Sequence, residues 1–196
     1  MLERELELDW LRQALKDASR GRGRVVLITG EAGIGKTRLA SEFLASAAKS
    51  ARTLWGACDD LDTPRVLGPI RDIARQVGGD LETLLGTSSQ KAEIFGAAAE
   101  ALDMRTSPTV AVIEDGHWAD AATVDVLKYL GRRIRQLRLV LVITYRDEEL
   151  VVGHPLRSAL GDLPPDGVLR LPLSSLSEAA VEAMAGSVNR SGTEVF

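Results

Sequence analysis

The stretch Gly30-Glu31-Ala32-Gly33-Ile34-Gly35-Lys36-Thr37 decides how the rest of this sequence is interpreted. It follows a short apolar run at residues 25–28 and precedes a segment with helical periodicity. Gly33 and Gly35 permit backbone angles and a close approach that a Cβ would prevent. Such a loop turns its N–H groups inward, and the positive end of the following helix adds to them. The stretch therefore predicts an anion-binding loop.

The spacing of this loop, Gly-x-x-x-x-Gly-Lys-Thr, fits the P-loop pattern of nucleoside triphosphate sites. Lys36 is expected to reach the β- and γ-phosphates of ATP, and the Thr37 hydroxyl to ligate Mg²⁺. The alternative is a glycine-rich turn without a ligand, but the strand before it and the helix after it favour the nucleotide. The expected nucleotide-binding residues are Gly30, Glu31, Ala32, Gly33, Ile34, Gly35, Lys36, Thr37 and Arg38.

Two carboxylates, Glu114 and Asp115, end a second apolar run at residues 110–113. In an open parallel sheet, ligands bind at the carboxyl ends of the strands, so both acids should lie on the edge that carries the phosphate loop. Mg²⁺ requires hard oxygen ligands, and a second acid can orient or deprotonate an attacking water. We assign Glu114 to the metal and Asp115 to the water. The alternative is a pair of surface acids in a turn.

A later apolar run at residues 139–144 is followed by Tyr145 and Arg146. In P-loop proteins with an additional strand, this strand inserts between the phosphate-loop strand and the acidic strand. Arg146 would then face the γ-phosphate with its planar fork of donors. It could instead be a surface arginine paired with Asp147 or Glu148. The candidate catalytic residues are thus Asp115, Glu114, Lys36 and Arg146.

Strands alternate with helices along the chain, which is typical of an open α/β sheet. We expect a P-loop NTPase fold with a five-stranded, mostly parallel sheet in the order 5-1-4-3-2, flanked by helices. An N-terminal helix should occupy residues 1–22, the core 23–172, and the start of an incomplete helical lid 173–196, with Ser177 as a helix N-cap. Trp10 and Trp55 are expected in the core. The expected strands are 25–28, 52–57, 110–113, 139–144 and 168–171, and the main helices are 2–18, 36–49, 70–77, 90–102 and 121–136, with Asp120 as the N-cap of the last.

Composition sets limits on the class of protein. The 196 residues are 45% hydrophobic and 27% charged with a net charge of −4, which indicates a globular domain and argues against a basic nucleic-acid-binding face. Cys58 is the only cysteine, so an intrachain disulfide is excluded. Apolar runs are too short to cross a bilayer, and the acidic N-terminus does not resemble a signal peptide, so we expect a cytoplasmic chain without membrane contact.

Several segments resemble one family, the ATPase domain of STAND signalling NTPases, and most closely the large ATP-binding regulators of the LuxR type, which are related to AAA+ ATPases. The segments are residues 3–8, 30–39, 61–64, Glu-Asp-Gly-His-Trp-Ala-Asp at 114–120, 144–146 and 154–157. The resemblance implies a switch whose ATP and ADP states differ in lid packing, with Glu114, Asp115 and Arg146 in the roles given above. It also implies a longer parent that contacts DNA only through a C-terminal helix-turn-helix absent from this chain, and possible self-association in the ATP state. This chain would then be an excised or truncated nucleotide-binding domain.

The function expected from these features is a regulatory ATP switch with slow hydrolysis. A small-molecule or nucleotide kinase, a GTPase and a nucleotide-binding scaffold without turnover are the alternatives. The sequence shows no Arg-rich lid, which argues against a kinase. It also lacks an Asn-Lys-x-Asp motif, which argues against a GTPase. Three other features each have a functional and a structural interpretation. Arg4 could lie near the adenine or pack in the core, and His117 could contact a phosphate or pack with Trp118. The arginines at 132, 133 and 135 could supply an arginine finger to a neighbouring subunit or form a solvated helix end.

Overall fold

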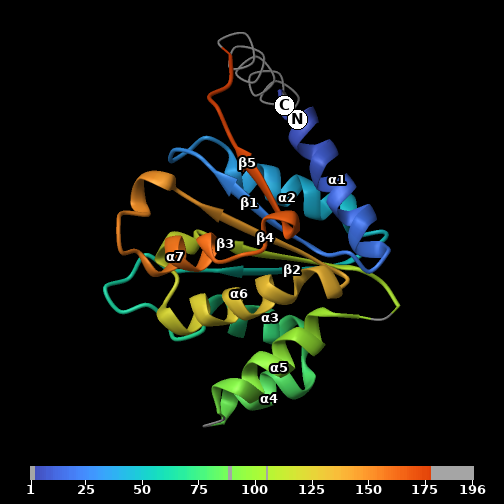
Figure 1. The fold of residues 1–196 in the computed structure, drawn as a ribbon, viewed down its shortest axis with the longest axis vertical. Helices are drawn as coiled ribbons and strands as arrows, with labels where there is room; N and C mark the ends of the chain where they lie inside the picture. The colour runs from blue at the N-terminus through green and yellow to red at the C-terminus, as the bar shows by residue number, and fades with distance from the viewer. Residues whose placement is uncertain (1–2, 88–89, 105, 178–196) are drawn as a thin grey trace, which may run out of the picture.

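The computed structural model describes residues 3–87, 90–104 and 106–177, and these form a five-stranded sheet (Figure 1). The order is β2-β3-β4-β1-β5, and every pairing among the described strands is parallel. This is the expected order 5-1-4-3-2 read from the other edge, so the predicted fold is confirmed. The strands are β1 (Arg24–Thr29), β2 (Arg52–Ala57), β3 (Thr109–Glu114), β4 (Leu139–Tyr145) and β5 (Val168–Pro172).

Helices cover both faces of the sheet. The α-helices are α1 (Glu5–Ser19), α2 (Lys36–Ala47), α3 (Gly68–Val77), α4 (Gly79–Gly86), α5 (Lys91–Leu102), α6 (Ala121–Arg133) and α7 (Pro155–Gly161). Short 3-10 turns are η1 (Gly116–Trp118), η2 (Ile134–Gln136), η3 (Asp147–Glu149) and η4 (Pro165–Gly167). Figure 1 shows α4 and α5 at one end of the molecule, beyond α3 and α6.

Alternate side chains of the central strands divide the core into two layers. Val26 and Val142 pack with α1 and α2, whereas Leu27 and Ile143 pack with α3, α6 and α7. All seven residues of β4 are buried. Strands covered on both faces need apolar side chains at every position, which explains their continuous hydrophobic runs.

One expected helix ends where predicted, but a helix after it was missed, and one residue was misplaced. Helix α3 ends at Val77, and the positive φ angles of Gly78 and Gly79, 70° and 74°, turn the chain directly into α4, which the sequence did not predict. Trp10 is not in the core, since 49% of its surface is exposed. Helix α1 buries a stripe of Leu8, Leu11, Ala14 and Ala18, and Trp10 lies outside it.

The described chain beyond β5 returns to the start of α1. Nη2 of Arg4 donates to the Ser174 carbonyl at 2.6 Å, and the Ser177 amide donates to Glu3 Oε2 at 2.8 Å. The helix expected after Ser177 lies outside the described residues. Among the helices of the described part, none is long and apolar enough to span a bilayer.

Candidate functional site

The loop between β1 and α2 has the backbone shape that its glycines allow. Gly30, Gly33 and Gly35 have φ angles of 141°, 75° and 100°, a region that residues with a Cβ rarely adopt. A Cβ on Gly30 would also lie 2.9 Å from the Leu173 carbonyl oxygen. Among the described residues, no side chain caps the N-terminus of α2. Its first N–H groups therefore remain available to an anion at the loop.

Lys36 closes this loop from inside. Its side-chain nitrogen donates to the carbonyl oxygens of Gly30 and Glu31, both at 2.7 Å, and the residue is only 6% exposed. Burial lowers the pKa of the Lys36 ammonium, and the charge of Arg146 adds to this effect. Asp115 and Glu149 raise the same pKa, so all these charges act at one edge of the sheet.

Glu114 lies at the end of β3 and bonds to the start of α2. Thr37 Oγ1 donates to Glu114 Oε1 at 2.5 Å, and Trp55 Nε1 donates to Glu114 Oε2 at 3.2 Å. Both carboxylate oxygens are therefore held in place. The sequence predicts Trp55 only as a core residue, whereas it is partly buried and also reaches this carboxylate. No local pattern in the sequence points to this contact, which depends on the pairing of β2 with β3: Ala57 lies opposite Glu114, and Trp55 is two residues earlier on the same face.

Asp115 occupies a tight turn after β3. Its φ and ψ angles are 51° and 47°, in the left-handed region, which is uncommon for a residue with a side chain. The turn is fixed because the Asp115 amide donates to Thr144 Oγ1 at 3.0 Å and its carbonyl accepts from the Trp118 amide at 2.9 Å. Strained backbone of this kind persists where the surroundings impose it, and it is concentrated at functional sites.

Arg146 follows β4 and pairs with an acid other than the two that the sequence suggested. Its Nη1 lies 2.7 Å from Glu149 Oε1, whereas the expected alternative partners were Asp147 and Glu148. The guanidinium carbon also lies 5.4 Å from the centre of the Trp118 ring. The end of β4 is thus on the same edge as the phosphate loop, as its position between β1 and β3 requires.

His117 is enclosed next to this ion pair. Its side chain is 0% exposed, and within the described structure neither ring nitrogen has a hydrogen-bond partner. Its Nε2 lies 3.7 Å from Glu149 Oε2, and burial lowers the pKa of the imidazole. The ring packs against Trp118 at a centroid distance of 4.4 Å. Trp118 is partly buried against the core.

The other arginines considered from sequence lie elsewhere. Arg4 is 2% exposed and bonds to Glu3 and Ser174 carbonyls. Arg133 stacks on Tyr129, and Arg135 donates to the Asp166 carbonyl at 3.1 Å. Arg133 is the last residue of α6 and Arg135 lies in η2, just before β4 begins, at the edge opposite the phosphate loop.

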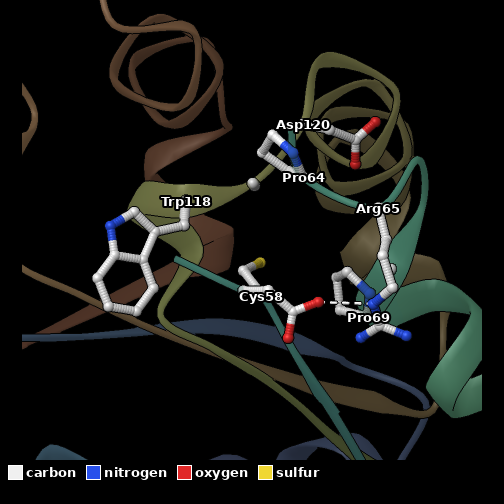
Figure 2. Close-up of a pocket in the computed structure, with 9 residues that line it drawn as sticks. Cys58, Pro64, Arg65, Pro69, Trp118 and Asp120 are labelled. Carbon is white, nitrogen blue, oxygen red and sulfur yellow. Dashed lines mark hydrogen bonds and ion pairs between the residues drawn. The ribbon is translucent and has the colours of Figure 1, made fainter. Parts of the chain in front are cut away.

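A shallow pocket beside the acidic strand end is a packing contact rather than a ligand site. Figure 2 shows Cys58, Arg65, Trp118 and Asp120 around it, and it has no room for a water-sized sphere. Arg65 Nε pairs with Asp59 Oδ2 at 2.6 Å. Burial raises the pKa of the Cys58 thiol to about 12, which makes it a poor nucleophile.

The oxygen donors at this edge suit a magnesium ion better than a closed protein metal site. In the described part of the chain, no three His, Cys, Asp or Glu side chains form a metal-binding group. Thr37 and Glu114 nevertheless lie in contact at the phosphate loop. Mg²⁺ commonly takes one or two protein oxygens and completes its octahedral coordination with water and phosphate. The residues present therefore fit Mg²⁺ bound together with a nucleotide.

Comparison with known proteins agrees with this architecture. An uncharacterized protein of Rhizobium meliloti, R02095, is 27% identical over 213 residues, and the match covers 85% of this chain and 21% of that protein. The chain thus spans about a fifth of that relative. The Aeropyrum pernix Orc1 protein, solved in complex with DNA, superposes with a TM-score of 0.69 at 19% identity over 97% of this chain and 50% of its own.

A Pyrococcus horikoshii STAND protein with a tetratricopeptide repeat sensor, PH0952, superposes with a TM-score of 0.58 at 24% identity, covering 98% of this chain and 26% of its own. Both superpositions show the same fold. The family model for the AAA ATPase domain matches residues 1–143, most of the chain. The chain therefore belongs to the AAA ATPase domain family.

Proposed function

We propose that this chain binds ATP with Mg²⁺ at the loop of residues 30–37 and acts as the ATP-binding part of a signalling regulator. The observation that carries the proposal is the convergence at one sheet edge of the buried Lys36 ammonium, the uncapped start of α2 and the Thr37–Glu114 contact. A polyphosphate needs many donors directed at one place, and this edge supplies them.

Each residue near the loop has a role in this proposal. Lys36 exchanges its bonds to the Gly30 and Glu31 carbonyls for bonds to phosphate oxygens. Thr37 and Glu114 hold the metal, directly or through water. Bound Mg²⁺ supplies neutralisation of phosphate charge.

Asp115 is the residue proposed to orient or deprotonate the attacking water. Its main chain is fixed by Thr144 on β4 and by Trp118 on η1. A fixed backbone limits the positions of the carboxylate, which is what general-base catalysis requires. Arg146 is proposed to contact the γ-phosphate, because its charge acts on Lys36 from the neighbouring strand end.

The proposed role of the domain is a switch with slow hydrolysis. We assign residues 1–22 to an N-terminal segment that carries α1, residues 23–172 to the core, and the segment from residue 173 onward to the start of a lid. The resemblance to LuxR-type regulators supports transcriptional regulation by a longer parent, in which DNA would be bound by a separate helix-turn-helix. The chain also spans only 26% of the STAND protein and 21% of the Rhizobium relative, which supports a larger parent.

Titration calorimetry of the folded chain tests the proposal. ATP with Mg²⁺ should bind with one site, GTP should bind more weakly, and Lys36→Ala should abolish binding. Phosphate release should be slow and should require Mg²⁺. Absence of ATP binding by a well-folded wild-type sample would refute the proposal, and transfer of phosphate to a small acceptor would redirect it to a kinase.

A further inference from the structure

The Glu149 carboxylate and a γ-phosphate would compete for the same guanidinium, that of Arg146, and the proposed function does not account for this competition. Arg146 is the cation proposed for the γ-phosphate, yet its Nη1 already lies 2.7 Å from a Glu149 oxygen. The side chains are 29% and 35% exposed, so solvent only partly screens the pair. A second anion that approaches Arg146 must either displace this carboxylate or share the guanidinium with it.

We propose that Glu149 is a positioning residue that restrains Arg146 and thereby lowers the preference of the site for ATP over ADP. This inference rests on the proposed function. The guanidinium of Arg146 meets the γ-phosphate in ATP, whereas ADP has no group that needs it. A carboxylate that neutralises Arg146 therefore opposes ATP binding and leaves ADP binding nearly unaffected.

Two contacts hold the guanidinium of Arg146 in its present position. The guanidinium lies over the Trp118 ring at 5.4 Å as well as beside Glu149. Attraction between a cation and an aromatic face adds to the ion pair. Both contacts come from residues after β3 and β4, so a γ-phosphate would compete with both of them for the guanidinium.

Glu149 also has a second neighbour that could receive it. Its other oxygen lies 3.7 Å from His117 Nε2, in a fully buried imidazole whose nitrogens lack partners in the described structure. A shift of a few tenths of an ångström would bring the two atoms within hydrogen-bonding distance. An unpaired buried polar group is costly, so this new bond would offset part of the cost of releasing Arg146.

The test measures ATP and ADP affinity by calorimetry in Mg²⁺ for wild type, Glu149→Gln and Glu148→Gln. Gln keeps the shape of Glu149 without its charge. Glu148 is the matched control, because it is exposed on the same 3-10 turn and also acts on Lys36 by its charge. Glu149→Gln should bind ATP about two- to fivefold more tightly with unchanged ADP affinity, the range expected for a partly exposed ion pair. Glu148→Gln should change both nucleotides by the same factor.

A double-mutant cycle separates this role from a purely structural one. Arg146→Ala should weaken ATP but not ADP, and Glu149→Gln should have no further effect in that background. Glu149→Ala repeats the affinity comparison without the Gln side chain. The melting temperature of every variant shows whether the substitution changes the stability of the fold. Weaker ATP binding by Glu149→Gln, equal effects on ATP and ADP, or an effect that persists without Arg146 would each overturn the inference.

The two proposals fail in different ways. One outcome refutes only the inference on Glu149. In that outcome wild type binds ATP and Lys36→Ala does not, but the ratio of ATP affinity to ADP affinity is the same for Glu149→Gln as for wild type. If the folded wild type binds neither nucleotide, the proposed function and this inference are both refuted.

Discussion

Replacement of Lys36 by methionine should weaken ATP binding roughly 100-fold while leaving the fold nearly intact. The ammonium lies inside the phosphate loop with two carbonyl contacts at 2.7 Å. Methionine has a similar length and keeps the apolar stem, but it has no charge. The variant therefore isolates the contribution of the ammonium group.

The expected change in stability is small because two terms oppose each other. Loss of hydrogen bonds to a charged group costs about 1.5–3 kcal/mol each. Removal of the charged group also ends the cost of burying an ammonium in a residue that is 6% exposed, which raises the free energy of unfolding by several kcal/mol. A net change within about 1 kcal/mol corresponds to a shift in melting temperature of roughly 2–4 °C for a chain of this size.

The effect on binding has no such compensation. An ammonium that bridges two phosphates contributes about 3 kcal/mol through charge-assisted bonds, which is roughly 100-fold in the dissociation constant. Calorimetry with ATP and Mg²⁺ measures this change, and thermal unfolding by circular dichroism measures stability. Lys49→Met is the matched control, since Lys49 is exposed beyond the C-terminal end of α2.

The pH dependence of stability gives an independent check. Because the pKa of Lys36 is lowered in the folded protein, the folded state loses this proton before the unfolded chain does. Wild-type stability should therefore rise relative to Lys36→Met between that lowered pKa and the unfolded value of about 10.4. ATP affinity within threefold of wild type would refute the reasoning, and a melting temperature lowered by more than about 10 °C would show that the lysine supports the fold instead.

Three further predictions concern residues around the site. Trp55→Phe removes the indole hydrogen bond to Glu114, so the Mg²⁺ concentration for half-maximal phosphate release should rise about fivefold. The control variant Trp10→Phe should leave this concentration unchanged. If Trp55→Phe also leaves it unchanged, Thr37 alone positions the carboxylate. Asp120 caps α6 and also accepts from the Leu67 amide, so Asp120→Ala should cost about 2 kcal/mol and lower the melting temperature by roughly 4–8 °C, with Asp120→Asn closer to wild type. Cys58 should react with a thiol reagent at pH 8 only as the protein unfolds, because burial raises its pKa to about 12, and rapid reaction of the native chain would contradict the packing in Figure 2.

Local chemistry in the sequence determined the phosphate loop, the strands and the acidic strand end, whereas the strand order was predicted from the pattern of P-loop proteins with an additional strand. Glycines at 30, 33 and 35 restrict the backbone to one kind of loop, and continuous apolar runs restrict the strands to a sheet covered on both faces. The Asp120 cap was also predictable, because capping depends on residues within one turn, and its side chain accepts from the amides of Ala122 and Thr123.

The tertiary structure alone decided which side chains hold the site residues. Trp55 and Glu114 are 59 positions apart, and only the pairing of β2 with β3 brings the indole to the carboxylate. The choice of Glu149 rather than Asp147 or Glu148 for Arg146 depends on the turn of η3, and the burial of His117 depends on the elements around it. Trp10 was misplaced for the same reason. Helical spacing shows that apolar residues share a region of the helix surface, but the neighbouring α2 and the sheet determine which stripe is buried.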